Sequence, residues 1–237
     1  MFKPKALSYE LDTSGLSINE VSALHYNMFV AHNYDWWYEV LPDDIVVDVG
    51  CSVGAFSAKA LDAGAAKVYM VEPNREILKT AIRNVSDYII DQEEQRVFPI
   101  NAAMGRTDVD LSNIHQIKGN EPCEEPRLMS LRQMTDTLNI ERIDFLKINA
   151  NGAELSILDP DNIDYLCKNV RHIALVVHLN AHYGTNAKFK VWREKFLRPM
   201  MEKSQVRFQN ESFAEKIFDE NFNEVLPHSF LVYITNW

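Results

Sequence analysis

The stretch VVDVGCSVGAF, residues 46–56, decides the fold of this chain. It begins inside an apolar run, IVVDVG (45–50), of the kind that forms a buried parallel strand. Gly50 and Gly54 then make a glycine loop that leaves the strand and opens a helix over residues 55–66. The loop fits two enzyme signatures. One is D-x-G-x-x-x-G, typical of a site for a nucleotide-like ligand, and the other is G-x-S-x-G, the nucleophile elbow of hydrolases.

Strands and helices alternate along the rest of the chain. Short apolar runs predict buried strands, and helical periodicity with polar faces predicts the segments between them. The order of elements predicts an α/β fold with a doubly wound parallel sheet, because right-handed crossovers join successive parallel strands. The predicted strands are 67–73, 96–104, 143–149, 172–179 and 229–237, with 206–210 as a hairpin partner of the last; the predicted helices are 75–85, 130–138, 152–159 and 187–204.

The segment before the first strand has a different pattern. Apolar residues recur at three- and four-residue spacing within residues 17–40, and Ser17 with Glu20 fits a capping box, so a helix is predicted there. Pro42 ends the pattern. Trp36 and Trp37 stand out, and we expect at least one of them to pack in the core, where tryptophan mostly serves.

Composition narrows the class of protein. The chain has 237 residues, enough for one α/β domain with an extension, and its net charge of −10 argues against a broad nucleic-acid footprint. Three scattered cysteines suit neither a disulfide framework nor a zinc site. The first residues lack the apolar core of a signal peptide, and no run is long enough to span a membrane. We expect a cytoplasmic protein without membrane or nucleic-acid partners.

The hydrolase interpretation of the loop fails on position. An α/β-hydrolase places its nucleophile after several strands and takes an oxyanion donor from an earlier loop. Only one predicted strand precedes Ser52, and the segment before that strand is helical without a glycine-rich loop. Ser52 is therefore not expected to be a nucleophile.

The loop also departs from a dinucleotide site. G-x-G-x-x-G needs its second glycine so that the backbone can approach a pyrophosphate, and Ser52 occupies that position. S-adenosylmethionine has no pyrophosphate and does not need that glycine. Glu72 ends the second strand, where a carboxylate would accept from the ribose hydroxyls, and Asp48 adds negative charge beside a cationic ligand. The pattern favours S-adenosylmethionine as the cofactor.

At this point the sequence resembles a family. The segments 46–61, 64–85, INAAMG (100–105), MTDTL (134–138) and IDFLKINANGAELSIL (143–158) are similar to the FkbM-type S-adenosylmethionine-dependent methyltransferases. The resemblance covers residues 45–180 or so. It implies a Rossmann-like class I methyltransferase fold: a doubly wound, mostly parallel seven-stranded sheet with an antiparallel last strand. We accordingly divide the chain into an N-terminal helical extension, 1–44, and a Rossmann-like methyltransferase domain, 45–237.

The resemblance also assigns roles. It implies methyl transfer to an oxygen, often of a sugar or small molecule. The methionine part of the cofactor is assigned to the loop, the ribose to the end of the second strand, and the adenine to the end of the third. The cofactor residues so implied are Asp48, Gly50, Cys51, Ser52, Val53, Gly54, Glu72, Asn101 and Ala102.

The chain departs from the family pattern K-I-D-x-E-G-x-E after the fourth strand. Lys147 and Glu154 match it, whereas Asn149 and Asn151 replace its aspartate and its first glutamate. Val176 likewise stands where the family has the acid of an E-x-H pattern on the next strand. Neutral side chains at these positions are poor partners for a divalent cation and cannot act as a general base, so we expect a site without metal.

Catalytic candidates are then few. His178 and His182, at and after the end of the fifth strand, are the best-placed acceptors for a hydroxyl proton. Asn149 can orient a substrate hydroxyl, and Lys147 and Glu154 are expected either to pair with each other and shape the site or to serve structure alone. Two hypotheses stay open: an active O-methyltransferase of a small molecule or sugar, and a catalytically degenerate domain that acts as a cofactor-binding or structural module. The acceptor and the oligomeric state are not readable from the sequence.

Overall fold

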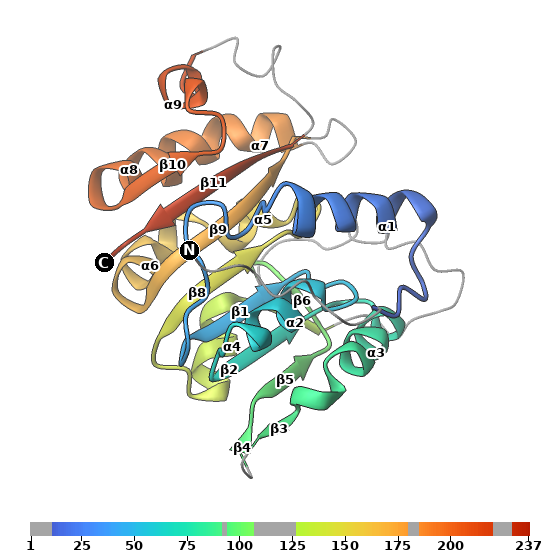
Figure 1. Ribbon diagram of the computed structural model, residues 1–237. Helices are drawn as coiled ribbons and strands as arrows, with labels where there is room; N and C mark the ends of the chain where they lie inside the picture. Colours follow the sequence, from blue (N-terminus) through green and yellow to red (C-terminus); the bar gives the residue numbers. More distant parts are fainter. Residues whose placement is uncertain (1–10, 92–93, 107–126, 180–184, 220–228) are drawn as a thin grey trace, which may run out of the picture.

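The protein is built on one seven-stranded sheet (Figure 1). The computed structural model describes residues 11–91, 94–106, 127–179, 185–219 and 229–237. The strand order is β10-β11-β9-β8-β1-β2-β5. The strands are β1 Ile45–Val49, β2 Lys67–Val71, β5 Val97–Ile100, β8 Ile143–Ile148, β9 Val170–His178, β10 Gln205–Phe208 and β11 Ser229–Thr235.

The direction of the strands agrees with the predicted fold. β5, β2, β1, β8 and β9 pair in parallel, and β11 runs antiparallel to both β9 and β10. The predicted hairpin between residues 206–210 and the last strand is therefore confirmed. β2 and β5 follow β1 on one side of the sheet, whereas β8 and β9 lie on its other side. The direction in which the chain adds strands therefore reverses between β1 and β8. In open α/β sheets such a reversal is where ligands bind, at the carboxyl ends of the strands.

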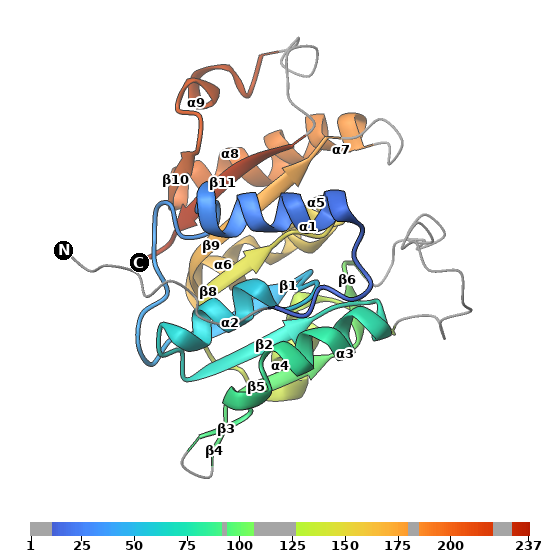
Figure 2. The same cartoon turned by 45° about the vertical axis from the view of Figure 1, so that its right-hand side comes forward.

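Helices cover both faces of the sheet (Figure 2). One face carries α1 Ile18–His25, its π-helical continuation η1 Tyr26–Val30, α2 Ala55–Asp62, α3 Arg75–Asn84 and the short η2 Ser86–Tyr88. The opposite face carries α4 Leu131–Leu138, α5 Glu154–Ile157, η4 Pro160–Asn162, α6 Ile163–Asn169, the continuous run α7 Thr185–Trp192, η6 Arg193–Leu197 and α8 Arg198–Lys203, and then α9 Ser212–Lys216. No helix among the described residues has the length and apolar character needed to cross a membrane.

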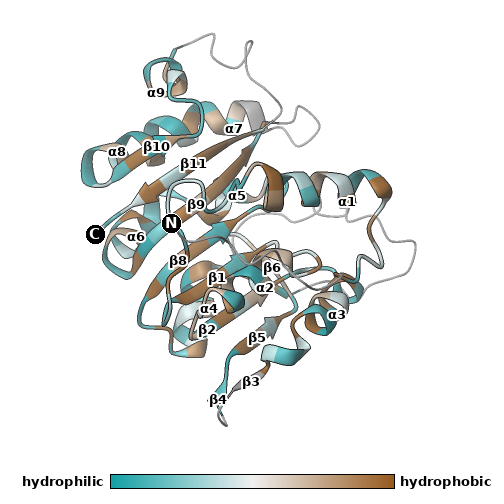
Figure 3. Ribbon diagram, in the orientation of Figure 1, coloured by the Kyte–Doolittle hydropathy of each residue, from teal (hydrophilic) through white to brown (hydrophobic). Residues whose placement is uncertain are grey.

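The hydropathy of the elements explains the two layers. Apolar residues fill the central strands, whereas the helices carry them on one side only (Figure 3). Because side chains alternate along a strand, Val47 and Leu146 face the α4–α8 side and Val46 and Phe145 face the α2–α3 side. Both helices begin at a side-chain cap: Asn74 Oδ1 accepts from two backbone N–H groups of α3, and Ser130 and Gln133 make a capping box at α4.

The prediction of a single strand over residues 96–104 is wrong. β5 ends at Ile100, and residues Ala102–Met104 form β6, which pairs with β7 Arg127–Met129 in a separate two-stranded sheet. Asn101 causes the break, since its Nδ2 donates to the carbonyl oxygens of Glu72, at 3.0 Å, and Pro73, at 2.9 Å. A second two-stranded sheet joins β3 Ile90–Asp91 to β4 Glu94–Gln95.

The N-terminal helix is shorter than the periodicity predicted. It begins at the Ser17–Glu20 capping box, as expected, but helical structure ends at Val30 instead of near residue 40. The backbone of His32 is left-handed, with φ of 49°, and Asn33 bonds back to Asn27 through both backbone and side chain. These contacts turn the chain into an irregular segment, residues 31–44.

The two adjacent tryptophans lie on this segment. Trp36 is 44% exposed and Trp37 is 36% exposed, so neither is in the core. The expectation that at least one would be buried is wrong, because Tyr34 and Val40 of the same segment take the inward positions at 5% and 7% exposure. The indoles instead lie beside β10 and β11 at the surface.

Gly50 sets how closely β1 and β8 approach at their carboxyl ends. Its backbone is left-handed, with φ of 71°, and a Cβ atom built there would lie 2.0 Å from the carbonyl oxygen of Asn149. That oxygen belongs to the backbone, which cannot rotate aside as a side chain would. Only glycine fits this position.

We expect Gly50→Ala to lower the melting temperature strongly. A left-handed alanine costs about 1–2 kcal/mol and overpacking about 1–3 kcal/mol more, so the free energy of unfolding should fall by about 2–5 kcal/mol. For a chain of this size that is a fall of roughly 4–20 °C in a thermal melt. Gly105→Ala is the control, because its Cβ would meet only side-chain atoms, the Ser156 hydroxyl at 3.3 Å and a Leu128 methyl group at 3.6 Å. Equal melting temperatures for the two variants would contradict the assigned packing.

Candidate cofactor and active site

The carboxyl ends of four parallel strands bring the sequence candidates to one edge of the sheet. Gly50 follows β1, Glu72 follows β2, Asn149 follows β8, and His178 is the last residue of β9. Figure 1 shows these strand ends beside α5 and the start of α2. His182, the other predicted proton acceptor, lies outside the described residues.

The glycine loop is held in an unusual backbone conformation. Ser52 is left-handed, with φ of 51°, as are Gly50 and Gly54 on either side. A Cβ at Gly54 would lie 3.1 Å from the Cβ of Ala81 on α3, so this glycine lets α2 and α3 pack closely. Cys51 is 3% exposed, and burial raises the pKa of its thiol well above its ordinary value. Cys51 and Val53, which is fully buried, therefore act as packed side chains of the loop.

Glu72 connects the glycine loop to the second strand. Its Oε2 accepts from the backbone N–H of Ser52 at 3.1 Å, and its Oε1 accepts from the N–H of Asn74 at 3.0 Å. The side chain is 8% exposed, and burial raises the pKa of its carboxyl, although these two bonds favour the charged form. A carboxylate oxygen can accept two hydrogen bonds, so each oxygen retains capacity for one further donor.

Asp48 and Lys147 form a buried ion pair between β1 and β8. Lys147 Nζ lies 2.8 Å from Asp48 Oδ1, and the two side chains are 4% and 0% exposed. Asp48 Oδ2 accepts from the Ser57 hydroxyl at 2.7 Å, and Lys147 also donates to the carbonyl oxygen of Gly50 at 2.6 Å. Burial lowers the pKa of Lys147, but the charge and hydrogen bond of Asp48 together with Tyr34 and Cys51 outweigh it and leave the pKa raised. The lysine therefore stays charged at neutral pH and fixes the glycine loop.

Glu154 organises the loop after β8. Its side chain is fully buried and accepts from the backbone N–H groups of Ala150 and Gly152, both at 2.8 Å. Its Oε1 also lies 2.7 Å from Nδ1 of His178, whose side chain is 22% exposed. The expected pairing of Lys147 with Glu154 is thus wrong, because Lys147 pairs with Asp48 and Glu154 contacts His178. The carboxylate instead orients a histidine whose Nε2 is on the far side of the ring.

Comparisons with known proteins place this arrangement in a family. The sequence profile of the methyltransferase FkbM domain matches residues 48–209. The chain belongs to this family. Its fold is similar to that of the crystal structure of methyltransferase FkbM from Methylobacillus flagellatus KT, with a TM-score of 0.53 and 15% identity over 84% of this chain and 45% of that one.

The chain is also similar to part of a much larger protein. The chain is 30% identical over 209 residues to the AMB antimetabolite synthetase AmbE of Pseudomonas aeruginosa. The match covers 70% of this chain but only 10% of AmbE. The fibrillarin of Aeropyrum pernix, solved with bound S-adenosyl-L-methionine, is a more distant neighbour, with a TM-score of 0.49 and 12% identity over 88% of this chain and 74% of that one.

Three neutral residues stand where the FkbM pattern has acids, and their surroundings differ. Asn149 Nδ2 donates to the Tyr34 hydroxyl at 2.6 Å, so the amide is fixed from outside the matched domain. Asn151 is left-handed, with φ of 49°, a conformation that asparagine tolerates in a tight turn. Val176 is 8% exposed and packs with the apolar residues of the α2–α3 face.

Tyr34 is a site residue that the sequence did not reveal. Its ring lies over Lys147 Nζ at 5.2 Å from the centroid and meets Phe56 edge to face. The sequence pattern predicted that Tyr34 lies inside a long helix, and no motif includes it.

The two candidates that follow the third strand have different surroundings. The Asn101 side chain donates to carbonyl oxygens at the end of β2, whereas Ala102 is 1% exposed within β6.

We expect Lys147→Met to destabilise the fold by leaving the charge of Asp48 buried without a partner. Breaking a buried pair in this way costs about 3–5 kcal/mol, which corresponds to a fall of roughly 6–20 °C in melting temperature. Lys79→Met removes an exposed pair with Glu76 and should leave the melting temperature almost unchanged. The double variant Asp48→Asn with Lys147→Met should recover part of the loss in a double-mutant cycle. Strictly additive losses would show that the two charges are not coupled.

Proposed function

We propose that this domain is an S-adenosylmethionine-dependent O-methyltransferase that acts on a hydroxyl of a small molecule or sugar. The observation that carries the proposal is Glu72: a buried carboxylate at the tip of β2, bonded to the loop that follows β1. Membership of the FkbM family supports methyl transfer, and the remaining assignments rest on the residues of this chain.

The residues fit the cofactor. Glu72 has acceptor capacity left for two vicinal hydroxyls, which is the donor pattern of a ribose. Asn101 and Ala102 follow the adjacent strand, on the side proposed for the adenine, and the loop Gly50–Gly54 is proposed for the methionine part. Asp48 no longer offers free negative charge, since Lys147 neutralises it. The cofactor supplies an electrophilic methyl group on a sulfonium.

His178 is the proposed proton acceptor. Glu154 holds its Nδ1, which would leave Nε2 to receive the proton of an acceptor hydroxyl. The Asn149 amide, fixed by Tyr34, is proposed to orient the acceptor. Lys147 and Glu154 then act through other groups, as positioning residues.

The chemistry is proposed to need no metal. Among the residues that the structure describes, no group of three or more His, Cys, Asp or Glu side chains is arranged to hold an ion. A small or sugar acceptor is preferred over nucleic acid, because the net charge of −10 disfavours phosphate binding. A cofactor-binding or structural module is the second candidate, favoured by the neutral residues Asn149, Asn151 and Val176.

We expect Glu72→Gln to weaken S-adenosylhomocysteine binding in calorimetry. Loss of charge-assisted hydrogen bonds costs about 1.5–3 kcal/mol, which is roughly a tenfold to hundredfold rise in Kd. Glu76→Gln, on exposed surface at the start of α3, is the control and should bind as the natural protein does. An unchanged Kd for Glu72→Gln would remove the ribose assignment, and no binding by the natural protein would remove the cofactor.

The affinity should also fall on acidification earlier than an ordinary glutamate would allow. Burial raises the pKa of Glu72, so its protonated form persists to higher pH, and protonation removes the acceptor. Loss of affinity should therefore begin above the ordinary glutamate pKa of ~4.3. The raised pKa of Glu72 also affects the stability of the apoprotein. Its free energy of unfolding should fall as pH rises from the unfolded-state pKa through the higher folded-state pKa, because the buried carboxyl must then carry its charge.

We expect His178→Gln to lower kcat by ~10²–10⁴ without changing the Kd for S-adenosylhomocysteine. The assay measures S-adenosylhomocysteine release with a panel of sugar and small hydroxylated acceptors, in the presence of EDTA. His25→Gln, on exposed α1, is the matched control. Cofactor binding without turnover on any acceptor would favour the module, and turnover that requires added magnesium would contradict the metal-free proposal.

A further inference from the structure

Tyr34 brings a phenol hydroxyl from the N-terminal segment to the carboxyl end of β8. The residue is 5% exposed, and its hydroxyl oxygen accepts from Nδ2 of Asn149 at 2.6 Å. Its ring meets that of Phe56 edge to face, with 5.6 Å between the centroids, and the ring centroid lies 5.2 Å from Lys147 Nζ. Contacts with α2 and β8 together therefore set the position of the phenol oxygen.

The residues on either side of Tyr34 are bonded to two different layers of the fold. The Asn33 carbonyl oxygen accepts from the hydroxyl of Tyr233 on β11, and Asp35 pairs with Lys59 of α2. The backbone is thus fixed immediately before and after Tyr34. Tyr34 is held between the sheet and α2 as a rigid support, although it lies in an irregular segment.

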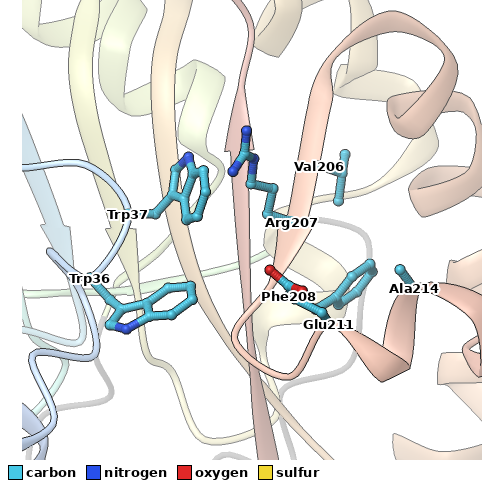
Figure 4. A pocket seen from close by; sticks show the side chains of 7 residues that line it. All are labelled: Trp36, Trp37, Val206, Arg207, Phe208, Glu211 and Ala214. Carbon is cyan, nitrogen blue, oxygen red and sulfur yellow. The ribbon is translucent and has the colours of Figure 1, made fainter.

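The aromatic residues that follow in this segment lie away from the site. Trp36 and Trp37 line a surface groove of about 250 Å³ together with residues of β10 (Figure 4). Tyr38 stacks on His172, which is near the amino end of β9, whereas the site lies at the carboxyl ends of the strands. Tyr38 therefore offers a second phenol of the same segment at a distance from Asn149.

The bond to Tyr34 sets which end of the Asn149 amide faces the site. One end of an amide donates hydrogen bonds and the other accepts them. Because Nδ2 is bonded to the phenol oxygen, Oδ1 is the end that remains for a ligand, and no donor in the described part of the chain bonds to it. Asn149 is half-buried, whereas Lys147 is buried, so this oxygen is within reach of a small molecule.

The register of β8 and β9 places this oxygen near the proposed proton acceptor. Ile148 pairs with Leu175, so the continuation of the register sets Asn149 beside Val176 and diagonally from His178. Side chains two positions apart on a strand share a face. Since His178 is assigned the only proton of the reacting hydroxyl, Asn149 Oδ1 is left for a second donor on the same acceptor molecule.

We propose that Tyr34 is a positioning residue, which holds the Asn149 amide with Oδ1 toward the acceptor so that Oδ1 accepts from a hydroxyl next to the one that is methylated. This inference rests on the proposed function and assigns no covalent step to Tyr34. A carboxylate in place of the amide would not need this support, because both of its oxygens accept. The dependence on Tyr34 is therefore specific to asparagine at position 149.

The test measures Tyr34→Phe in two backgrounds, the natural protein and Asn149→Asp. Release of S-adenosylhomocysteine is followed in EDTA with glucose, rhamnose, glycerol and catechol, each of which has neighbouring hydroxyls. In the natural background we expect Tyr34→Phe to raise KM for the acceptor by roughly threefold to tenfold, which corresponds to one neutral hydrogen bond, with less effect on kcat. In the Asn149→Asp background the same substitution should raise KM by less than twofold. Tyr38→Phe is the control and should leave KM unchanged.

A second measurement needs no turnover. In ¹⁵N spectra the side-chain amide signal of Asn149, assigned by its loss in Asn149→Asp, should move in Tyr34→Phe and stay in place in Tyr38→Phe. An unmoved signal, or an equal rise in KM in both backgrounds, would overturn the proposal and leave the proposed function intact. If the natural protein methylates none of the four acceptors, the proposed function and this inference are both overturned.

Discussion

The buried pair of Asp48 and Lys147 is the interaction on which the rest of the site depends. Two charged side chains lie in the interior, and charges there are tolerated only when they are paired and bonded. Because Asp48 is on β1 and Lys147 on β8, the pair joins the two strands at the point where the chain order reverses. Lys147 also holds the Gly50 carbonyl, so the same cation fixes the glycine loop that begins there.

Of the three buried carboxylates at the site, Asp48, Glu72 and Glu154, one remains available to a ligand. Asp48 is matched by Lys147, and Glu154 is occupied by His178 and two backbone N–H groups. Glu72 alone accepts only from backbone amides and has acceptor capacity left on both oxygens. A neutral polyol such as a ribose can use that capacity without bringing a charge of its own, which is why the proposed function rests on Glu72 and not on Asp48.

The sequence pattern predicted the strands of the sheet but not the side-chain contacts between them. Short segments such as 45–49 and 143–148 were predicted as buried parallel strands, and the structure buries four consecutive residues of the first and six of the second. The break at Asn101 could not be predicted, since it depends on carbonyl groups that lie 28 and 29 residues earlier in the chain. The pairing of Lys147 failed for the same reason: sequence proximity suggested Glu154, whereas parallel register placed Asp48 directly opposite.

The irregular segment 31–44 makes several contacts that the sequence did not predict. The sheet holds it at several points: Tyr233 donates to the Asn33 carbonyl, Gln209 donates to the Asn33 side chain at 3.2 Å, and Asn149 donates to Tyr34. Tyr34 is buried and contacts Asn149 and Lys147, whereas Trp36 is exposed and lies beside Tyr233 of β11. The segment lies outside the matched FkbM domain, residues 48–209, as does β11. A residue beyond the family domain therefore completes the candidate site, since Tyr34 holds the Asn149 amide and lies beside the Lys147 ammonium group.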